Sequence, residues 1–205
     1  MRNSQTGLSR PTKENRLQVL RNGCLLLVCL FSIGCLRSLH PLFTQSETIL
    51  DSDLVGTWVS KDQKLVIEPG DSTSYTIIIF GKMDSPAKFK SRLGQIGRYR
   101  FLDLYPDDQS QVNNSVYELH ELPAHTFLKL ELNKETLYLS MLSAAWFDKL
   151  PEKDQAKITH ERVSGYEEFS NFAVLTGQPK ELKELVLNYA EDKDAFPEPT
   201  KFQKR

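Results

Sequence analysis

The sequence predicts a mainly β domain of the α+β class, in which an antiparallel meander forms a barrel-like or strongly bent sheet with one or two C-terminal helices. Three observations predict this fold. Short runs of β-branched and aromatic residues recur along the chain, turn-forming residues separate them, and a clear amphipathic helix pattern appears only late. With 205 residues, 40% of them hydrophobic and 26% charged, the chain suits one globular domain and a short appendage.

The first predicted strands follow one another at short intervals. One of them ends at the turn residues Pro69-Gly70-Asp71. The next is apolar on both faces, which is typical of a strand that is covered on both sides. A third alternates apolar with basic residues, so one of its faces is buried and the other is in water. These patterns, with a partner strand for the third, cover Leu65–Ile67, Tyr75–Phe80, Ala87–Leu93 and Gly97–Tyr105.

A first hairpin is expected before the middle of the domain. A turn at Leu122-Pro123 would place His120 opposite His125. The same register would place Tyr117 opposite Leu128 on the apolar side.

A second hairpin follows directly. A turn at Asn133-Lys134 would place Leu130 opposite Leu137 and Leu128 opposite Leu139. Since side chains alternate between the two faces of a strand, one apolar face is predicted. It holds Leu128, Leu130, Leu132, Leu137 and Leu139.

Helix patterns belong to the C-terminal half. Ser143 can cap a short helix over Ala144–Leu150, which Pro151 ends. A second helix is expected over Pro179–Ala190, because its apolar residues are spaced as one helical face. They are Leu182, Leu185, Val186 and Tyr189. Weaker strand patterns lie between the helices, over Ile158–Arg162 and Ala173–Leu175.

The N-terminal segment has the features of an export signal. Gly23–Leu36 contains no charged residue, lies between Arg21 and Arg37, and follows a stretch rich in Arg and Lys. Its roughly 14 residues fall short of the ~20 that a membrane-spanning helix needs, but match the apolar part of a signal peptide. All three cysteines of the chain lie in this segment. Disulfides and cysteine-based zinc sites are therefore excluded from the domain that follows.

The end of this segment, Phe31-Ser32-Ile33-Gly34-Cys35, resembles the lipobox of bacterial lipoproteins. Gly34 and Cys35 match the pattern, whereas Ser32 stands where that family has an aliphatic residue. The resemblance implies that Cys35 is lipidated and becomes the new N-terminus. An uncleaved short membrane anchor, a simple cleaved signal and a buried helix are the alternatives. The predicted organisation is a signal peptide or anchor over 1–35, a tether over 36–52, a β domain over 53–197 and a polar tail over 198–205.

The domain opens with Gly56 and Trp58 in a Gly-x-Trp pattern that resembles the first strand of lipocalins. This resemblance implies a barrel that Trp58 closes at one end. The interior of such a barrel can hold an apolar ligand or be filled by its own side chains, and at this size filling is the safer expectation. Trp58 as an ordinary core aromatic is the alternative. The candidate ligand-lining residues are Trp58, Phe89, Tyr117, Leu128, Leu130, Leu137 and Leu139.

Candidate polar sites are few. His120 and His125, with Glu118 on the same face, can offer two imidazoles and a carboxylate to a metal, although surface histidines explain them as well. We therefore expect no metal and no cofactor.

Two charged clusters complete the polar residues of interest. A basic stripe can meet anionic lipid or an acidic partner, or is simply a solvated face. A set of aspartates marks either a calcium site or a polar strand end. The stripe comprises Lys88, Lys90 and Arg92, with Arg98 and Arg100 as possible members, and the aspartates are Asp103, Asp107 and Asp108.

The overall charge and the missing motifs limit the possible functions. A net charge of -1 and a pI near 6.4 argue against nucleic acid as a partner. The sequence contains no Gly-x-Ser-x-Gly, phosphate-loop or Gly-x-Gly-x-x-Gly motif, so an enzyme is not expected. The leading expectation is an exported envelope lipoprotein facing the periplasm or cell exterior, attached to the membrane through its N-terminal segment or a lipid on Cys35. Its barrel-like module would bind an apolar small molecule or an envelope protein. A structural lipoprotein without a small ligand is the alternative, and a hydrolase is a third.

Overall fold

The computed structural model describes residues 34–81, 86–107, 123–163 and 172–205. The chain divides into two compact units, 1–34 and Cys35–Arg205, and the second unit contains the fold described below. No helix among the described residues combines the length and apolar character needed to cross a bilayer.

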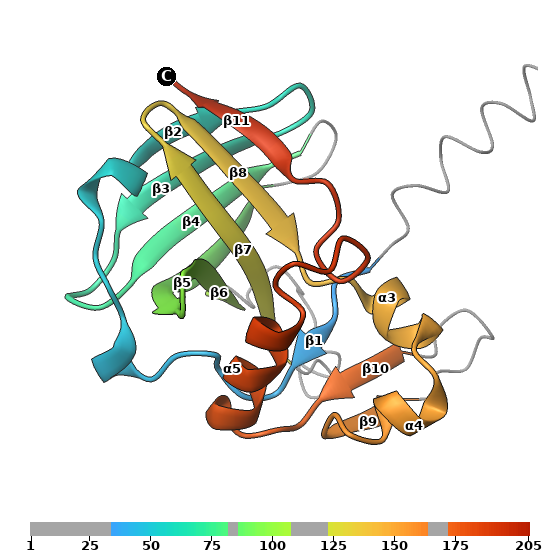
Figure 1. Ribbon diagram of the computed structural model, residues 1–205. Coiled ribbons are helices and arrows are strands. Elements are labelled where there is room, and N and C mark those ends of the chain that lie inside the picture. Colours follow the sequence, from blue (N-terminus) through green and yellow to red (C-terminus); the bar gives the residue numbers. More distant parts are fainter. Residues whose placement is uncertain (1–33, 82–85, 108–122, 164–171) are drawn as a thin grey trace, which may run out of the picture. The chain divides into compact units, whose positions relative to one another are not determined.

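Eight antiparallel strands of this unit form a closed barrel (Figure 1). Each strand pairs with its predecessor, and the last strand pairs with both the seventh and the first, which closes the sheet. The predicted mainly β fold with an antiparallel barrel-like sheet is thereby confirmed. The strands are β2 (Gly56–Val59), β3 (Lys64–Pro69), β4 (Tyr75–Phe80), β5 (Ala87–Ile96), β6 (Tyr99–Pro106), β7 (His125–Asn133), β8 (Thr136–Met141) and β11 (Thr200–Lys204).

The barrel interior is filled by apolar side chains from every strand. The predicted leucine face of β7 and β8 points into it, as alternation along the strands requires. Trp58 is fully buried there, donates from Nε1 to the carbonyl of Leu54 at 2.8 Å, and lies under the ammonium of Lys204. The buried members are Leu54, Trp58, Leu65, Ile67, Tyr75, Ile77, Leu93, Leu102, Leu104, Leu128, Leu130, Leu137, Leu139 and Phe202, with Phe89 and Leu132 partly buried against them.

A second core lies outside the barrel, where the helices and a three-stranded extension cover one side of it. β1 (Arg37–Ser38) pairs with β7 and, in parallel, with β10 (Phe172–Leu175), which pairs with β9 (His160–Val163). The remaining elements are α3 (Ala144–Lys149), α4 (Glu152–Gln155), α5 (Pro179–Asn188) and two 3₁₀ turns, η1 (Gln45–Glu47) and η2 (Ser52–Leu54).

Both predicted helices are confirmed. Ser143 caps α3, since its side chain accepts a hydrogen bond from the amide of Trp146 at 3.2 Å. α5 begins at Pro179 and buries Leu182, Leu185 and Val186 in the second core. The helix face inferred from residue spacing is therefore the face that packs on the barrel.

The segment predicted as a tether, 36–52, belongs to the fold instead. Leu36 and Leu42 are fully buried and Phe43 is 1% exposed. The ring of Phe43 lies against the backbone of Gly94, where an added Cβ would come within 2.4 Å of it. The tether prediction is wrong because these few apolar residues show no periodicity of their own. Their partners are brought together only in the second core, by the outer face of the barrel, the helices and β10.

The predicted polar tail over 198–205 is also wrong, because Thr200–Lys204 forms β11. Its Lys204 pairs with Trp58 of β2 and its Thr200 with Leu139 of β8. The strand has a single buried apolar side chain, Phe202, so the sequence shows no alternation. The backbone hydrogen bonds that remove both barrel edges hold it in place.

The second hairpin differs in register from its prediction. Leu130 lies opposite Leu139 rather than Leu137, so the turn is Lys134-Glu135 rather than Asn133-Lys134. Lys134 takes the left-handed conformation with φ 52° that the turn requires. The shift changes each pairing by two residues, an even number, so every side chain keeps its predicted face.

The first predicted hairpin is wrong at Leu128. This residue lies between Leu102 of β6 and Met141 of β8, so no position is left for Tyr117 beside it. The reason is that β7 pairs with β6, and 18 residues separate these two strands in sequence. Tyr117, Glu118 and His120 lie outside the described residues.

Candidate functional site

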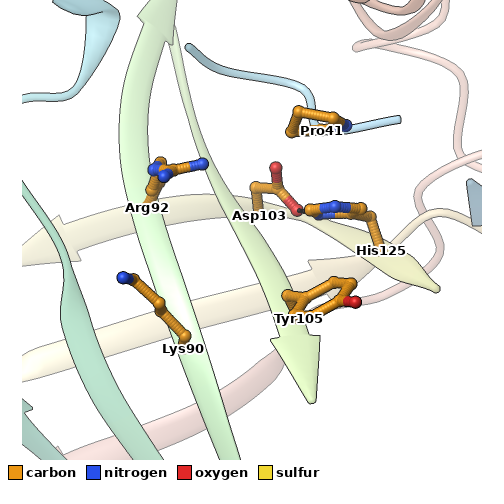
Figure 2. Close-up of a pocket in the computed structure, with 6 residues that line it drawn as sticks. All are labelled: Pro41, Lys90, Arg92, Asp103, Tyr105 and His125. Atoms are coloured by element: carbon orange, nitrogen blue, oxygen red, sulfur yellow. Dashed lines mark hydrogen bonds and ion pairs between the residues drawn. The ribbon is translucent and has the colours of Figure 1, made fainter. Parts of the chain in front are cut away.

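A pocket of about 230 Å³, lined by several charged and polar side chains, lies on the outer face of the barrel, over β5, β6 and β7 (Figure 2). Its walls come from outward-pointing residues of the three strands and from the segment after β1. In this register Arg92 lies opposite Asp103, and Lys90 lies opposite Tyr105. We call this site the outer pocket. Its residues are Pro41, Lys90, Arg92, Asp103, Tyr105 and His125.

Asp103 is the buried acid of the outer pocket, with only 2% of its surface exposed. Its Oδ1 is 2.7 Å from Nδ1 of His125, and its Oδ2 accepts a hydrogen bond from the amide of Leu42 at 2.8 Å. A buried carboxylate is tolerated only when such partners replace its water. Asp103 therefore holds the Leu42 segment against the barrel and fixes the orientation of the imidazole at once.

His125 is held on two sides. Its Nδ1 faces the carboxylate of Asp103, and its ring lies against Tyr105 with 4.7 Å between the ring centroids. An ionised Asp103 accepts a hydrogen bond from the N–H group at Nδ1, which leaves Nε2 as the nitrogen able to interact with a ligand. No described residue forms a hydrogen bond to Nε2.

The two cations of the outer pocket differ in their partners. Lys90 donates to Asp71 at 2.8 Å, and this hydrogen bond holds the pKa of the Asp71 carboxyl well below its usual range. Arg92 forms no hydrogen bond or ion pair with any described residue, and its Nε is enclosed without a partner. Guanidinium groups carry five donors in a planar fork, so Arg92 has most of its hydrogen-bonding capacity unused.

The predicted basic stripe is not a uniform cationic surface. Four of its five residues are paired with carboxylates within the described residues, namely Lys88 with Asp107, Lys90 with Asp71, Arg98 with Glu191 and Arg100 with Asp51. Arg92 is the exception.

The predicted aspartate cluster does not come together. Asp103 is buried in the outer pocket, Asp107 forms an ion pair with Lys88 at the surface, and Asp108 lies outside the described residues.

Only one of the three candidate metal-binding residues lies in the part of the chain that the structure describes. His125 lies in the outer pocket, while Glu118 and His120 lie outside the described residues. Within the described ranges, no three side chains of His, Cys, Asp or Glu come together as a metal site would require.

The predicted ligand-lining residues lie in the barrel interior, apart from Tyr117, which lies outside the described residues. Trp58, Leu128, Leu130, Leu137 and Leu139 are buried against one another. The predicted lipidation residue, Cys35, is a half-buried free cysteine whose backbone forms an isolated β-bridge with Ser143. Burial raises the pKa of its thiol.

A second pocket, of about 350 Å³, lies beside β6, β7 and β8 and is lined by residues 190–199. Three of its polar side chains already have partners within the protein. Lys129 donates to the carbonyl of Ala190 at 2.7 Å, Tyr99 to Glu191 at 2.6 Å, and Ser140 to the carbonyl of Pro197. The outer pocket is therefore the stronger candidate, because it combines an oriented histidine with an unpaired arginine.

One sequence signal pointed to the outer pocket. Asp103 interrupts an otherwise apolar and aromatic strand, Phe101-Leu102-Asp103-Leu104-Tyr105, where an isolated carboxylate must find a partner. Its partner could not be named, because His125 is 22 positions away and reaches it only through the pairing of β6 with β7.

Comparisons with protein-family models, curated proteins and solved structures give no match to this chain. The chemistry of the outer pocket is thus derived from its own geometry. An oriented imidazole and an unpaired guanidinium can together bind a small polar molecule that carries negative charge.

Proposed function

We propose that this protein is an exported cell-envelope protein, attached to the membrane through its N-terminal segment or a lipid on Cys35. Its β-barrel serves as a binding module, and its ligand site is the outer pocket. The observation that carries the proposal is the guanidinium of Arg92, which no described residue pairs with, beside the Asp103–His125 pair. A polar group left without a partner lowers stability, so it is commonly retained where a ligand completes it.

The outer pocket is preferred over the barrel interior for a physical reason. The interior side chains are packed against one another, so a ligand would have to displace apolar contacts that stabilise the barrel. In the outer pocket a ligand instead supplies hydrogen bonds that the protein does not make. The barrel then acts as a rigid support for three strands whose outward residues form the site.

The anchor proposal is supported by the apolar run and the lipobox-like Gly34-Cys35. A lipid on Cys35 would leave almost no linker, since Leu36 is buried and donates its amide to the carbonyl of Leu142 at 2.9 Å. The barrel would then be held directly at the membrane surface.

Palmitate labelling tests the lipid. We expect wild-type protein expressed in a bacterium to incorporate radioactive palmitate and Cys35→Ala to incorporate none, because the sulfur of Cys35 is the attachment point of the lipid. Cys29→Ala is the matched control and should keep the label. A wild-type protein without label would contradict lipidation and favour the uncleaved anchor.

Native mass spectrometry tests the binding module. We expect the full chain, purified in mild detergent, to carry a small molecule that is released on unfolding. The His125→Ala variant should lose it, while His160→Ala, a histidine outside the outer pocket, should retain it. If the wild type carries no small molecule, the result favours the structural, protein-interaction alternative.

One observation favours the hydrolase alternative. A buried carboxylate that orients an imidazole is the arrangement of a general base and its supporting acid. No described serine or cysteine side chain forms a hydrogen bond to His125, so the pair lacks the nucleophile that a covalent mechanism needs. Binding is therefore the function that we place first.

A further inference from the structure

We infer that the ligand of the outer pocket is a small organic carboxylate with a single negative charge, held by Arg92 and by the Nε2 of His125. This inference rests on the proposed function, which makes the outer pocket the ligand site, and it adds the chemical class of the ligand.

The first argument is the hydrogen-bonding capacity of Arg92. Asp103 lies opposite it in the sheet, yet both carboxylate oxygens of Asp103 are already engaged by His125 and the amide of Leu42. Since Nε of Arg92 is enclosed, a ligand meets the terminal nitrogens of the guanidinium. These two groups form a planar fork that matches the two oxygens of a carboxylate.

The second argument is the charge of the outer pocket. Lys90 is neutralised by Asp71, so it adds little net charge. Arg92 contributes one positive charge, Asp103 one negative charge and His125 one positive charge when protonated. The described residues of the site therefore carry at most one net positive charge, which a singly charged ligand balances. A doubly charged phosphate would leave excess negative charge beside the buried Asp103.

The third argument is the shape of the outer pocket and the chemistry of its walls. At about 230 Å³ it is smaller than the pockets of drug-sized ligands. Pro41 and the ring of Tyr105 supply apolar surface next to the charged groups. This combination fits a short aliphatic or aromatic acid, with its carboxylate at Arg92 and its apolar part against these two residues.

The orientation of His125 has a role in this arrangement. Asp103 engages Nδ1, so Nε2 is the nitrogen that interacts with the ligand. The protonated imidazole donates from Nε2 to a carboxylate oxygen, and Asp103 balances the resulting positive charge. Asp103 is thus a positioning residue, which acts on the ligand through His125.

Matched acids and amides test the inference on the full chain. We expect butyrate and benzoate to shift the NMR signals of the His125 ring in a saturable titration. Butyramide and benzamide, which have nearly the same shape without the charge, should bind about 10- to 100-fold more weakly. Inorganic phosphate should bind more weakly than either acid. Amides that bind as well as the acids, or phosphate that binds more tightly, would overturn the carboxylate assignment.

Arginine variants test whether Arg92 is the residue that binds the carboxylate. Arg92→Gln should weaken benzoate binding about 10- to 100-fold, and Arg92→Lys should restore it only in part, because an ammonium lacks the planar fork. Arg98→Gln, on the surface next to β6, should leave it unchanged. Equal benzoate affinity in Arg92→Gln and the wild type would refute the role of Arg92. The wild-type comparison of acids with amides needs no variant, so it still decides the question if Arg92→Gln does not fold.

The two proposals fail in different ways. If native mass spectrometry finds a bound neutral or doubly charged molecule, the binding module stands and the carboxylate assignment fails. If it finds no ligand and no acid shifts the His125 signals, both proposals fail.

Discussion

Replacing Phe43 with alanine is expected to lower the free energy of unfolding by about 3–5 kcal/mol, the usual cost of removing a buried phenylalanine ring. The ring is 1% exposed and fills the space over Gly94, where β5 has no side chain. The surrounding barrel strands are held by their own hydrogen bonds and cannot collapse into the cavity. Urea unfolding followed by tryptophan fluorescence measures the change.

Leu50→Ala is the matched control for Phe43, because it removes a large apolar side chain from the same segment. Leu50 is 60% exposed, so its loss should change stability by no more than about 0.5 kcal/mol. If Phe43→Ala were as mild as Leu50→Ala, the segment would be a tether after all. The pair of variants therefore decides whether the chain between Leu36 and Ser52 belongs to the fold in solution.

Replacing Asp103 with alanine is expected to cost about 2–6 kcal/mol of stability, because two buried hydrogen-bond donors each lose their acceptor. The change leaves the amide of Leu42 and Nδ1 of His125 without their acceptor. Two donors then lose a partner in a region that water reaches poorly, and each loss is costly. Denaturant unfolding measures the stability, and the His125 ring signals report the loss of orientation.

Asp107→Ala is the matched control for Asp103. This aspartate follows β6 directly and pairs with Lys88 at the surface, where an ion pair contributes about 1 kcal/mol or less. Asp103→Asn should have an intermediate effect, because its amide oxygen can still accept one of the two hydrogen bonds. Equal stability of the Asp103→Ala and Asp107→Ala variants would show that the Asp103 carboxylate does not hold the Leu42 segment.

Phe43 and Asp103, the residues of these two predictions, both hold the segment after β1 in place. Phe43 and Leu42 are neighbours, one packed over Gly94 and the other bonded to Asp103. The segment after β1 therefore covers the second core and also supplies a wall of the outer pocket through Pro41. A domain cut at Ser46, within η1, would lose both contacts. Binding studies should thus use the chain with this segment intact.

The prediction of the barrel strands depended on local patterns. Tyr75–Phe80 and the alternation around Leu93 identify strands, because side chains of a strand point to opposite faces whatever its partner is. The leucine face of β7 and β8 was predicted correctly even though the turn was misplaced. An error of two residues in pairing leaves every face unchanged.

The prediction of partners failed where pairing is non-local. β7 pairs with β6 across a gap of 18 residues in sequence, between Pro106 and His125. β11 carries one buried side chain, Phe202, and is fixed by backbone hydrogen bonds to β2 and β8. Backbone groups are the same in every residue, so the sequence gives no sign of which edge they close.

The sequence by itself determined the antiparallel β character of this protein, the leucine face of β7 and β8 that points into the barrel, and the starts of α3 and α5. It did so because periodicity and capping depend on neighbours within a few positions. Only the tertiary structure decided that β11 closes the barrel, that Leu42 and Phe43 belong to the fold, and that Asp103 meets His125 beside Arg92. These features require strands distant in sequence to lie side by side. The closed barrel brings their outward-facing side chains together in one pocket.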